Sequence, residues 1–344
     1  EHGQLKNDFQ ARRVDAGLDV VAGHLTYGFH AALKRPALYV TMLRNPVSTR
    51  VSGALYLARH RIGGDERRAV ALAMTAAATA ADDVEANGGD DDANVAFKDA
   101  DAIFLVGSRP RSKDMDRSDL VVANGPIFVG QGKAIDAVAS EDVKVITVGN
   151  PCNTNALIAN ANSPRIPSRQ FTAMTRLDQN RAIGQMAERS GVSASKIHDV
   201  FIWGNHANTM YPDPRFATVD GRKATDVFDL DWLEGEFLDT VATRGKAIIV
   251  ARGASSAASA ASAAIDHMRD WWQGSDGRIV SMALPSEGWY GVPEGLVFSF
   301  PCRCENGEIK VVEGLPIDSF AQSKIDENIA ELMEEREAVA GLLY

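Results

Sequence analysis

At 344 residues the chain can form one large α/β unit or two domains, and its 45% hydrophobic and 24% charged residues are those of an ordinary folded protein. A net charge of −10 argues against nucleic acid as the main partner, and no apolar run reaches the roughly 18 residues that a membrane span needs. An odd count of three cysteines without a C-x-x-C pair, and a first segment without a signal-peptide core, predict a cytoplasmic protein.

Charge divides the chain into two unequal parts. Residues 1–68 hold 11 Lys and Arg against 6 Asp and Glu, a net of +5, so residues 69–344 carry −15. Between the two parts, AVALAMTAAATAADDVEANGGDDDANVAF runs from an alanine-rich stretch to a Gly-Gly turn and an acidic cluster. We predict a domain junction within 62–90. The alternative is a single domain whose basic and acidic faces separate along the chain.

From residue 94 onward the sequence alternates strand and helix patterns. AIFLVGS (102–108) and VKVITVGNP (143–151) are short, β-branched apolar runs ending in Gly, which is typical of buried parallel strands. The segment between them has helical spacing, so the three pieces predict a β-α-β unit. The residues that carry this spacing are Leu120, Ala123, Ile127, Gly130, Ala134 and Ile135.

The remaining elements follow in order. HDVFIWGN (198–205) and KAIIVARG (246–253) predict further short strands. GASSAASAASAAIDHMRDWW (253–272) predicts a helix rather than a Ser/Ala linker, because it runs without Gly or Pro into an apolar helical segment. The end predicts an amphipathic helix whose charged residues face solvent and whose apolar face carries Ile325, Ile329, Leu332, Met333, Val339 and Leu342.

A lone histidine, His206, lies in WGNHANTMYPD (203–213), just past an apolar run. Such a histidine can be a satisfied structural group, a metal ligand or a catalytic base, and only the general ability of imidazole to titrate near neutrality favours chemistry. The sequence around it alone leaves all three roles open.

Four polar stretches carry the functional signal: SRPRSKDMDRSDL (108–120), VGNPCNTN (148–155), TRLDQNRA (175–182) and WGNHANTMYPD. Together with LVVANGPIFVGQGKA and GASSAASAA, in this order and spacing, they closely resemble the malate dehydrogenases of the bacterial and eukaryotic cytosol. The resemblance covers about residues 94–342. It implies an α/β fold, a truncated Rossmann-like parallel sheet followed by an α+β substrate domain, with the active site in the crevice between them.

The chemistry of 2-hydroxy acid oxidation explains why these residue types occur together. A hydride leaves for nicotinamide while a base takes the hydroxyl proton, so a group titrating near neutrality must lie beside the substrate. His206 suits that role, and the resemblance pairs it with Asp178, whose carboxylate would fix the imidazole tautomer and stabilise its charge. Arg181, three residues after Asp178 on the same expected helix face, suits a bidentate grip on the C1 carboxylate.

Two arginines, Arg111 and Arg117, fall in the loop after the first strand, at the carboxyl edge where such sheets bind ligands. By resemblance, Arg117 polarises the reacting carbonyl, Arg111 binds the distal carboxylate of a C4 dicarboxylate, and the loop closes over the substrate. Asn150 follows the second strand, where its amide can bond the substrate hydroxyl and the nicotinamide ribose. The resemblance implies NAD as the cofactor and no metal, with NAD lined by Asn124, Gln131, Val148, Gly149 and Asn150.

The front of the family pattern is missing. Such enzymes begin with a strand, a Gly-rich turn for the pyrophosphate and a helix, whereas GQGKAI (130–135) is a partial G-x-G-x-x-G in mid-helix. In its place, residues 24–59 resemble a fragment of the glycan sulfotransferases, with a strand, an R-x-P loop and a helix. That resemblance would place Arg44 and Ser52 on the donor's 3′-phosphate, but the upstream phosphosulfate loop is absent, which excludes a complete sulfotransferase. The alternative is that YVTMLRNP supplies only a substitute strand and a positive helix start.

These expectations divide the chain into a substitute or sulfotransferase-like segment (1–68), a partial NAD-binding Rossmann domain (69–172) and a malate dehydrogenase C-terminal domain (173–344). The first hypothesis is an NAD-dependent malate dehydrogenase of the tricarboxylic acid cycle, a cytoplasmic homodimer acting on malate and oxaloacetate. The second is a catalytically impaired chimera or remnant without the glycine-rich NAD loop. The sequence is compatible with a genuine fusion, a chimeric reading frame and a remodelled dehydrogenase.

Overall fold

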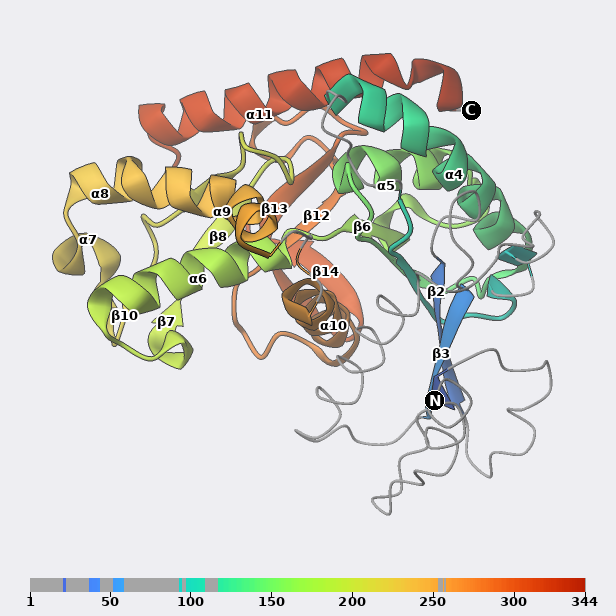
Figure 1. Cartoon of the computed structure of the whole chain (residues 1–344), viewed down its shortest axis with the longest axis horizontal. Coiled ribbons are helices and arrows are strands. Elements are labelled where there is room, and N and C mark those ends of the chain that lie inside the picture. The colour runs from blue at the N-terminus through green and yellow to red at the C-terminus, as the bar shows by residue number, and fades with distance from the viewer. Residues whose placement is uncertain are drawn as a thin grey trace.

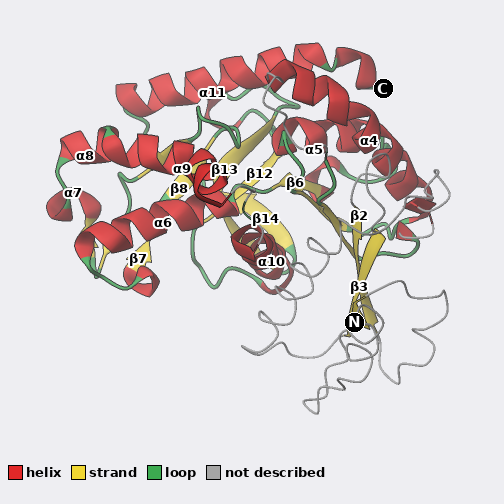
Figure 2. Ribbon diagram, in the orientation of Figure 1, coloured by secondary structure: helices red, strands yellow, loops and turns green. Residues whose placement is uncertain are grey.

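A computed structural model of the chain describes residues 21–22, 37–43, 52–58, 93–94, 97–108, 117–252, 256 and 258–343 (Figures 1 and 2). For the strands before residue 93, only the backbone pairing is described. The expected junction at 62–90, together with Arg44 and Arg111, lies outside the described residues.

One nine-stranded mixed sheet runs through the molecule in the order β1-β3-β2-β4-β5-β6-β12-β13-β14. The central strands β2, β4, β5 and β6 are parallel, and antiparallel strands extend the sheet on both sides. The α/β fold class expected from the sequence is therefore confirmed. The strands are β1 Val21–Ala22, β2 Ala37–Leu43, β3 Ser52–Ala58, β4 Ala102–Leu105, β5 Lys144–Thr147, β6 Phe171–Ala173, β12 Val280–Pro285, β13 Val297–Glu305 and β14 Glu308–Val311.

Helices cover both faces of this sheet, which explains why β4 is apolar at every position. Ile103 and Leu105 point into a core formed with α4 and α5, whereas Ala102 and Phe104 point into the core that includes α10. Full burial of a large apolar side chain such as Ile103, Leu105 or Phe104 contributes about 1.5 to 3 kcal/mol to the stability of the fold. The long helices are α4 Arg117–Val138, α5 Cys152–Ala161, α6 Arg176–Ser190, α9 Glu236–Arg252, α10 Ala258–Gln273 and α11 Ser319–Ala338.

The second half of the chain adds smaller elements around α6. Its short strands are β7 Ile197–His198, β8 Phe201–Trp203, β9 Tyr211–Asp213, β10 Thr218–Val219 and β11 Arg222–Lys223, and its short helices are α7 Ala224–Val227 and α8 Leu230–Glu234. The predicted strand at 198–205 corresponds to β8, which pairs with β9 as a hairpin. The loop between these two strands carries His206.

A buried charge cluster fixes α10 against the start of α6. Arg176, the first residue of α6, donates to Asp270 of α10 over 2.9 Å, and both side chains are buried. Burial by itself would raise the pKa of the Asp270 carboxyl, but the guanidinium groups around it, led by Arg176, hold that pKa below its ordinary value. The cluster therefore sets the position from which α6 presents its later residues.

The segment 246–252 is helical, so the predicted strand there is wrong. It forms the end of α9, whose Phe237 and Val241 are buried against α6, with Gly245 one turn further on. A short β-branched run has no period that separates strand from helix, and Ile249 and Val250 remain exposed where a buried strand was expected.

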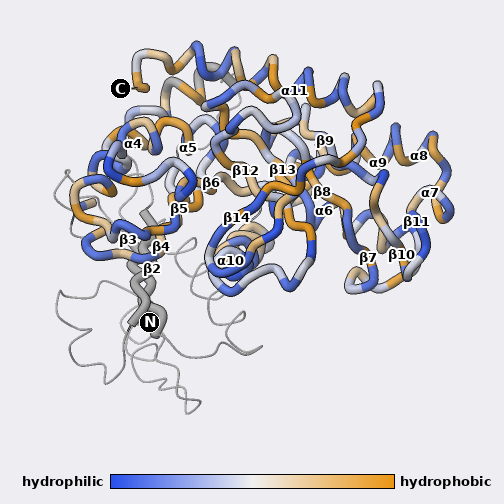
Figure 3. Tube along the Cα trace, turned by 180° about the vertical axis from the view of Figure 1, so that it is seen from behind, coloured by the Kyte–Doolittle hydropathy of each residue, from blue (hydrophilic) through white to orange (hydrophobic). Residues whose placement is uncertain are grey.

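The C-terminal helix α11 is confirmed, but its buried face differs from the prediction. Ile325, Leu332 and Val339 are buried as expected, whereas Met333 is 44% exposed. Asn328 and Glu335 are buried in its place, at the spacing that joins these three residues along one face. Figure 3 shows hydrophilic and hydrophobic turns alternating along the length of α11.

Near the N-terminus, β2 pairs in parallel with β4, from Val40 opposite Ala102 to Leu43 opposite Leu105. The YVTML part of YVTMLRNP thus supplies a strand of the main sheet. The helix expected after the R-x-P loop is wrong for 52–58, because these residues form β3, antiparallel to β2 along its whole length. This complete ladder satisfies the backbone groups that a helix would otherwise satisfy internally.

Among the described residues, no helix is long and apolar enough to cross a membrane.

Candidate active site

The loop between β8 and β9 is fixed at its base by two contacts. Trp203 donates from Nε1 to Asp213 over 3.0 Å, which joins the ends of the hairpin. Gly204 then exchanges backbone hydrogen bonds of 3.1 and 2.9 Å with Ser299 of β13. The loop therefore leaves the sheet at a defined point and displays His206 beyond it.

His206 and Asp178 meet in the structure although 28 residues separate them. Nδ1 of the imidazole lies 2.5 Å from Oδ2 of Asp178, whose side chain is fully buried, while the His206 side chain is 14% exposed. The backbone N–H of His206 donates to Oδ1 of Asn153 over 3.0 Å. These two contacts fix both the ring and the backbone that carries it.

This geometry determines what the imidazole can do. A carboxylate bound at Nδ1 favours the tautomer with a proton on that nitrogen, which leaves Nε2 to accept a proton from a bound substrate. The same carboxylate stabilises the imidazolium that results. The arrangement is that of a general base with an orienting acid.

Arg181 completes the cluster. Its Nη1 donates to Oδ1 of Asp178 over 3.0 Å, so one carboxylate holds both the imidazole and the guanidinium. Gly245 of α9 faces the guanidinium, because a Cβ there would lie 3.7 Å from Nη2. Nε of Arg181 is buried and has no hydrogen-bond partner in the described structure. The group therefore keeps donors available for an anionic ligand.

His267 shows what a structural histidine looks like in the same molecule. It is fully buried in α10, with Nε2 3.1 Å from Oγ1 of Thr172. Burial, followed by the charge of Arg176, lowers its pKa to about 3, so it stays neutral. His206 differs because it is partly exposed and bound to a carboxylate.

The ends of the parallel strands β4 and β5 lie beside each other, as strands in register require. Gly149 packs so closely there that a Cβ would lie 3.1 Å from the carbonyl oxygen of Gly107 and 3.2 Å from the ring of Phe128. Asn150 follows and is exposed at this edge. Asn153, the second residue of α5, connects this edge to the His206 backbone, so the two parts of the candidate site are contiguous.

The remaining predicted residues divide into three groups. Asn124 is buried and donates to the carbonyl of Asn150 over 2.9 Å, which joins α4 to the edge after β5. Gln131 is buried with both amide atoms lacking hydrogen-bond partners in the described structure. Arg117 begins α4 rather than lying in the loop, which corrects its predicted placement, and Arg111 is outside the described residues.

Sequence reasoning missed the residues that hold the His206 loop. Asn153 lies inside VGNPCNTN. Its position three residues after Asn150, at the end of the same predicted strand, was the available signal that it belongs to the site. The others are on α11: Asn328, Glu331 and Glu335. Asn328 falls between Ile325 and Leu332 on the apolar face, and that placement of a polar residue was the signal.

Comparisons with known proteins agree with this geometry. A family model described as lactate/malate dehydrogenase, NAD binding domain, matches residues 62–172, and the lactate/malate dehydrogenase, alpha/beta C-terminal domain, matches 175–342. A solved malate dehydrogenase from Naegleria fowleri is 42% identical with a TM-score of 0.72, covering 81% of this chain and 86% of that chain. This chain belongs to the lactate/malate dehydrogenase family. A lactate dehydrogenase from Trichomonas vaginalis, in complex with NADH and oxamate, is also similar, with 35% identity and a TM-score of 0.71 over 79% of this chain and 86% of that chain.

Membership of this family identifies the chain as a dehydrogenase with NAD as its cofactor, as expected from the sequence. The described residues fit a dinucleotide at this edge of the sheet. Gly149 allows a close approach of the backbone where a Cβ would crowd Gly107 and Phe128, and the unpaired amide of Gln131 on α4 offers a buried donor and acceptor. Among the described residues no cluster of three or more metal-ligating side chains occurs.

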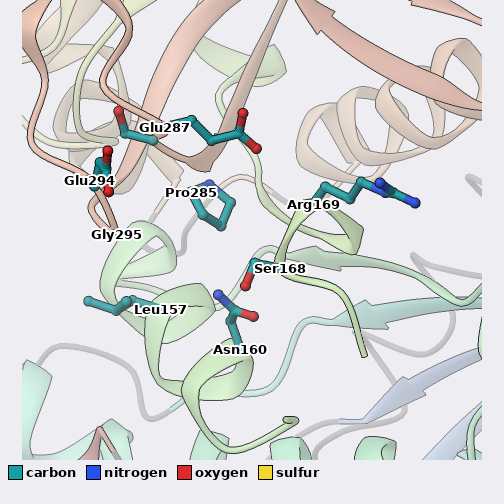
Figure 4. A pocket seen from close by; sticks show the side chains of 9 residues that line it. Leu157, Asn160, Ser168, Arg169, Pro285, Glu287, Glu294 and Gly295 are labelled. Carbon is teal, nitrogen blue, oxygen red and sulfur yellow. The ribbon is translucent and has the colours of Figure 1, made fainter. Parts of the chain in front are cut away.

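A separate hollow of about 400 Å³ lies between α5 and the turn joining β12 to β13 (Figure 4). Its charged side chains, Arg169, Glu287 and Glu294, are all exposed. None of the His206 cluster lines it, so it has no part in this dehydrogenase site. Cys302 and Cys304 also take no part: both are buried, and burial, followed by the charge of Asp270, raises the pKa of Cys304 to about 12.

We expect this dehydrogenase to bind NADH weakly. The sequence has no complete G-x-G-x-x-G turn, and β2 connects to antiparallel β3 through only eight residues, 44–51, instead of leading to a parallel strand through a helix. Each lost hydrogen bond to a charged phosphate costs about 1.5 to 3 kcal/mol, roughly 10- to 100-fold in Kd. Isothermal titration of the purified chain with NADH measures this directly.

A dissociation constant in the low micromolar range would contradict the expectation and show that residues 1–93 rebuild the missing contacts. The control is titration with the sulfate donor's 3′,5′-bisphosphate, which should not bind tightly. Tight binding that disappears in Arg44→Ala would instead support the sulfotransferase-like origin of the N-terminal segment.

Proposed function

We propose that the chain catalyses the reversible NAD-dependent oxidation of (S)-malate to oxaloacetate, with His206 as the proton acceptor. The observation that carries this proposal is the single buried carboxylate of Asp178 shared by His206 and Arg181. One group presents a base and the other a cation, which are the two requirements of a 2-hydroxy acid at its reacting end.

Bound NAD would supply the acceptor for the hydride at C2 of the substrate. Nε2 of His206 takes the proton of the C2 hydroxyl, and Asp178 stabilises the charge formed on the ring. Arg181 binds the C1 carboxylate through the donors that Asp178 leaves unused, which orients C2 toward the base. Asn150, exposed at the strand edge, would bond the substrate hydroxyl and help to hold the nicotinamide ribose.

Two arginines before and at the start of α4 would complete the site. We assign Arg117 to polarisation of the C2 carbonyl and Arg111 to the distal carboxylate of a C4 dicarboxylate, following the family resemblance of SRPRSKDMDR. Asn124, Gln131, Val148 and Gly149 would line NAD beside Asn150. A second carboxylate is what separates malate from lactate, so the substrate assignment depends on Arg111.

We propose the domain limits 69–172 and 173–344, preceded by a substitute segment, and a cytoplasmic homodimer that serves the tricarboxylic acid cycle. The second candidate is a catalytically impaired relative of these dehydrogenases. The hairpin of β2 and β3 favours it, because this hairpin stands where a strand, a phosphate-binding turn and a helix would be needed. Turnover of oxaloacetate with NADH by the full chain separates the two candidates.

The substrate is tested by Arg111→Gln, which should reduce kcat/KM for oxaloacetate far more than for pyruvate. The change leaves the distal carboxylate without its charge partner, while Arg117 and Arg181 still serve the reacting end. Losing such a pair in a closed site costs roughly 2 to 5 kcal/mol, about 30-fold to several thousand-fold. Initial rates of NADH oxidation with both oxo acids give the ratio.

A matched experiment uses a version whose first 90 residues are replaced by an intact family N-terminus, so that cofactor binding does not limit the rates. Equal losses for oxaloacetate and pyruvate would remove Arg111 as the discriminator and with it the chemical basis for malate.

A further inference from the structure

The His206 loop rests on polar side chains of the C-terminal helix α11. Oδ1 of Asn328 accepts from the backbone N–H of Asn205 over 2.8 Å, and its Nδ2 donates to the carbonyl of Thr209 over 2.6 Å. The Asn328 side chain therefore bonds the loop on both sides of His206. Asn205 and Asn328 are both fully buried, so neither amide can exchange these partners for water.

The backbone of Gly204 approaches Asn328 more closely than any other residue type would allow. Gly204 has φ of 95°, in the region that favours glycine, and a Cβ there would lie 2.0 Å from Oδ1 of Asn328. The loop conformation and the Asn328 side chain thus require each other. This packing contact is independent of the hydrogen bonds, and it also holds the His206 loop against Asn328.

A second set of contacts lies one and two turns further along α11, at Glu331 and Glu335. Nδ2 of Asn205 donates to Oε2 of Glu331 over 2.8 Å and to Oε1 of Glu335 over 2.9 Å. Thr209 donates to Glu331 over 2.5 Å, and Thr154 of α5 donates to Glu335. Glu335 is only 6% exposed. These carboxylates explain why α11 keeps charged residues on a face predicted to be apolar.

Asn153 holds the opposite side of the loop. Its Nδ2 donates to the carbonyl of Gly204 over 3.2 Å, and its Oδ1 accepts from the N–H of His206. With Asn328, it fixes the backbone from Gly204 to Thr209. The direction of the imidazole toward Asp178 is therefore set by this backbone frame as well as by the hydrogen bond to Asp178.

We propose that Asn328, supported by Glu335, is a positioning residue for His206, so that the C-terminal helix completes the site without touching the substrate. This inference rests on the proposed function, in which His206 is the proton acceptor. Asn328 acts through the loop backbone, and its loss allows the imidazole to leave the geometry in which Nε2 meets the substrate hydroxyl.

Asn328→Ala should lower kcat for oxaloacetate reduction about 10- to 100-fold, because misplacement of a reacting group by about 1 Å has an effect of this size. KM for oxaloacetate should change little, since Arg181 is held by α6 and α9. Asn328→Asp keeps the acceptor for the Asn205 N–H but sets a carboxylate oxygen against the carbonyl of Thr209, so its kcat should fall as well. Glu334→Gln, on the exposed face of the same helix, is the matched control and should leave the rate unchanged.

Hydrogen–deuterium exchange of the peptide spanning 203–210 gives a readout that needs no turnover. Exchange should rise in Asn328→Ala and stay unchanged in Glu334→Gln. If the unmodified chain does not reduce oxaloacetate, the proposed function fails, while the exchange result still decides whether α11 holds the loop. Unchanged exchange and unchanged kcat in Asn328→Ala overturn the inference. A loss of kcat in Glu334→Gln as large as that in Asn328→Ala overturns it too.

Should Asn328→Ala fail to fold, Thr209→Val decides the question from the loop side. This substitution preserves shape and removes only the hydroxyl that bonds Glu331 and Asn328. One such hydrogen bond corresponds to a fall in kcat of about 2- to 10-fold. The same rise in exchange should accompany it, and the absence of both effects counts against the inference.

Discussion

Replacing His206 with asparagine should lower turnover of oxaloacetate by about 10²- to 10⁴-fold, the usual contribution of positioned acid–base catalysis. Asparagine can still donate to Oδ2 of Asp178 and to solvent, so the loop and the buried carboxylate keep a partner. It has no nitrogen that exchanges a proton near neutral pH, which is the property the reaction requires. Stopped-flow or steady-state NADH oxidation measures the loss.

His198→Asn is the matched control for this substitution. His198 ends β7 and is exposed, so the same chemical change there should leave the rate unaffected. Thermal unfolding of both variants tests whether the fold is retained. An unchanged rate in His206→Asn would return His206 to a structural role of the kind that His267 has.

The elements with a clear period or a long apolar run were predictable from the sequence. β4, β5, α4 and α10 follow from buried strands covered on both faces and from helical spacing over several turns. The end of α9 was not predictable in this way, because AIIVA is short and β-branched. It continues a helix whose earlier turns, at Phe237 and Val241, pack against α6.

The site divides along a similar line. Residue types and order suggested His206, Asp178 and Arg181, but a separation of 28 residues in sequence contains no distance, so their contact came only from the resemblance and then from the structure. The residues on α11 were not predictable. From periodicity alone, polar residues such as Asn328 and Glu335 would be expected to face solvent. Contacts with a loop more than 100 residues earlier in the chain bury them instead.

Replacing Asp178 with asparagine should reduce kcat by about 10⁴-fold, the size of the same carboxylate-to-amide change in a Ser-His-Asp triad. Arg181 has only donors, so the introduced amide would have to turn its oxygen toward that guanidinium and its NH₂ toward the imidazole. Nδ1 of His206 must then accept, which moves the ring proton to Nε2. The nitrogen that faces the substrate hydroxyl can no longer take its proton.

This forced tautomer distinguishes two substitutions at the same position. Asp178→Ala removes the orienting group without imposing the wrong tautomer, so its kcat should be no lower than that of Asp178→Asn, although asparagine keeps the buried volume and should unfold at a higher temperature. Asp220→Asn is the control, because that carboxylate is exposed and pairs only with Lys196 among the described residues. A loss of less than about 10-fold in Asp178→Asn, or a clearly higher kcat for asparagine than for alanine, would contradict the role of Asp178 in fixing the tautomer. The first outcome would mean that the backbone frame around Asn153 and Asn328 holds the imidazole without it.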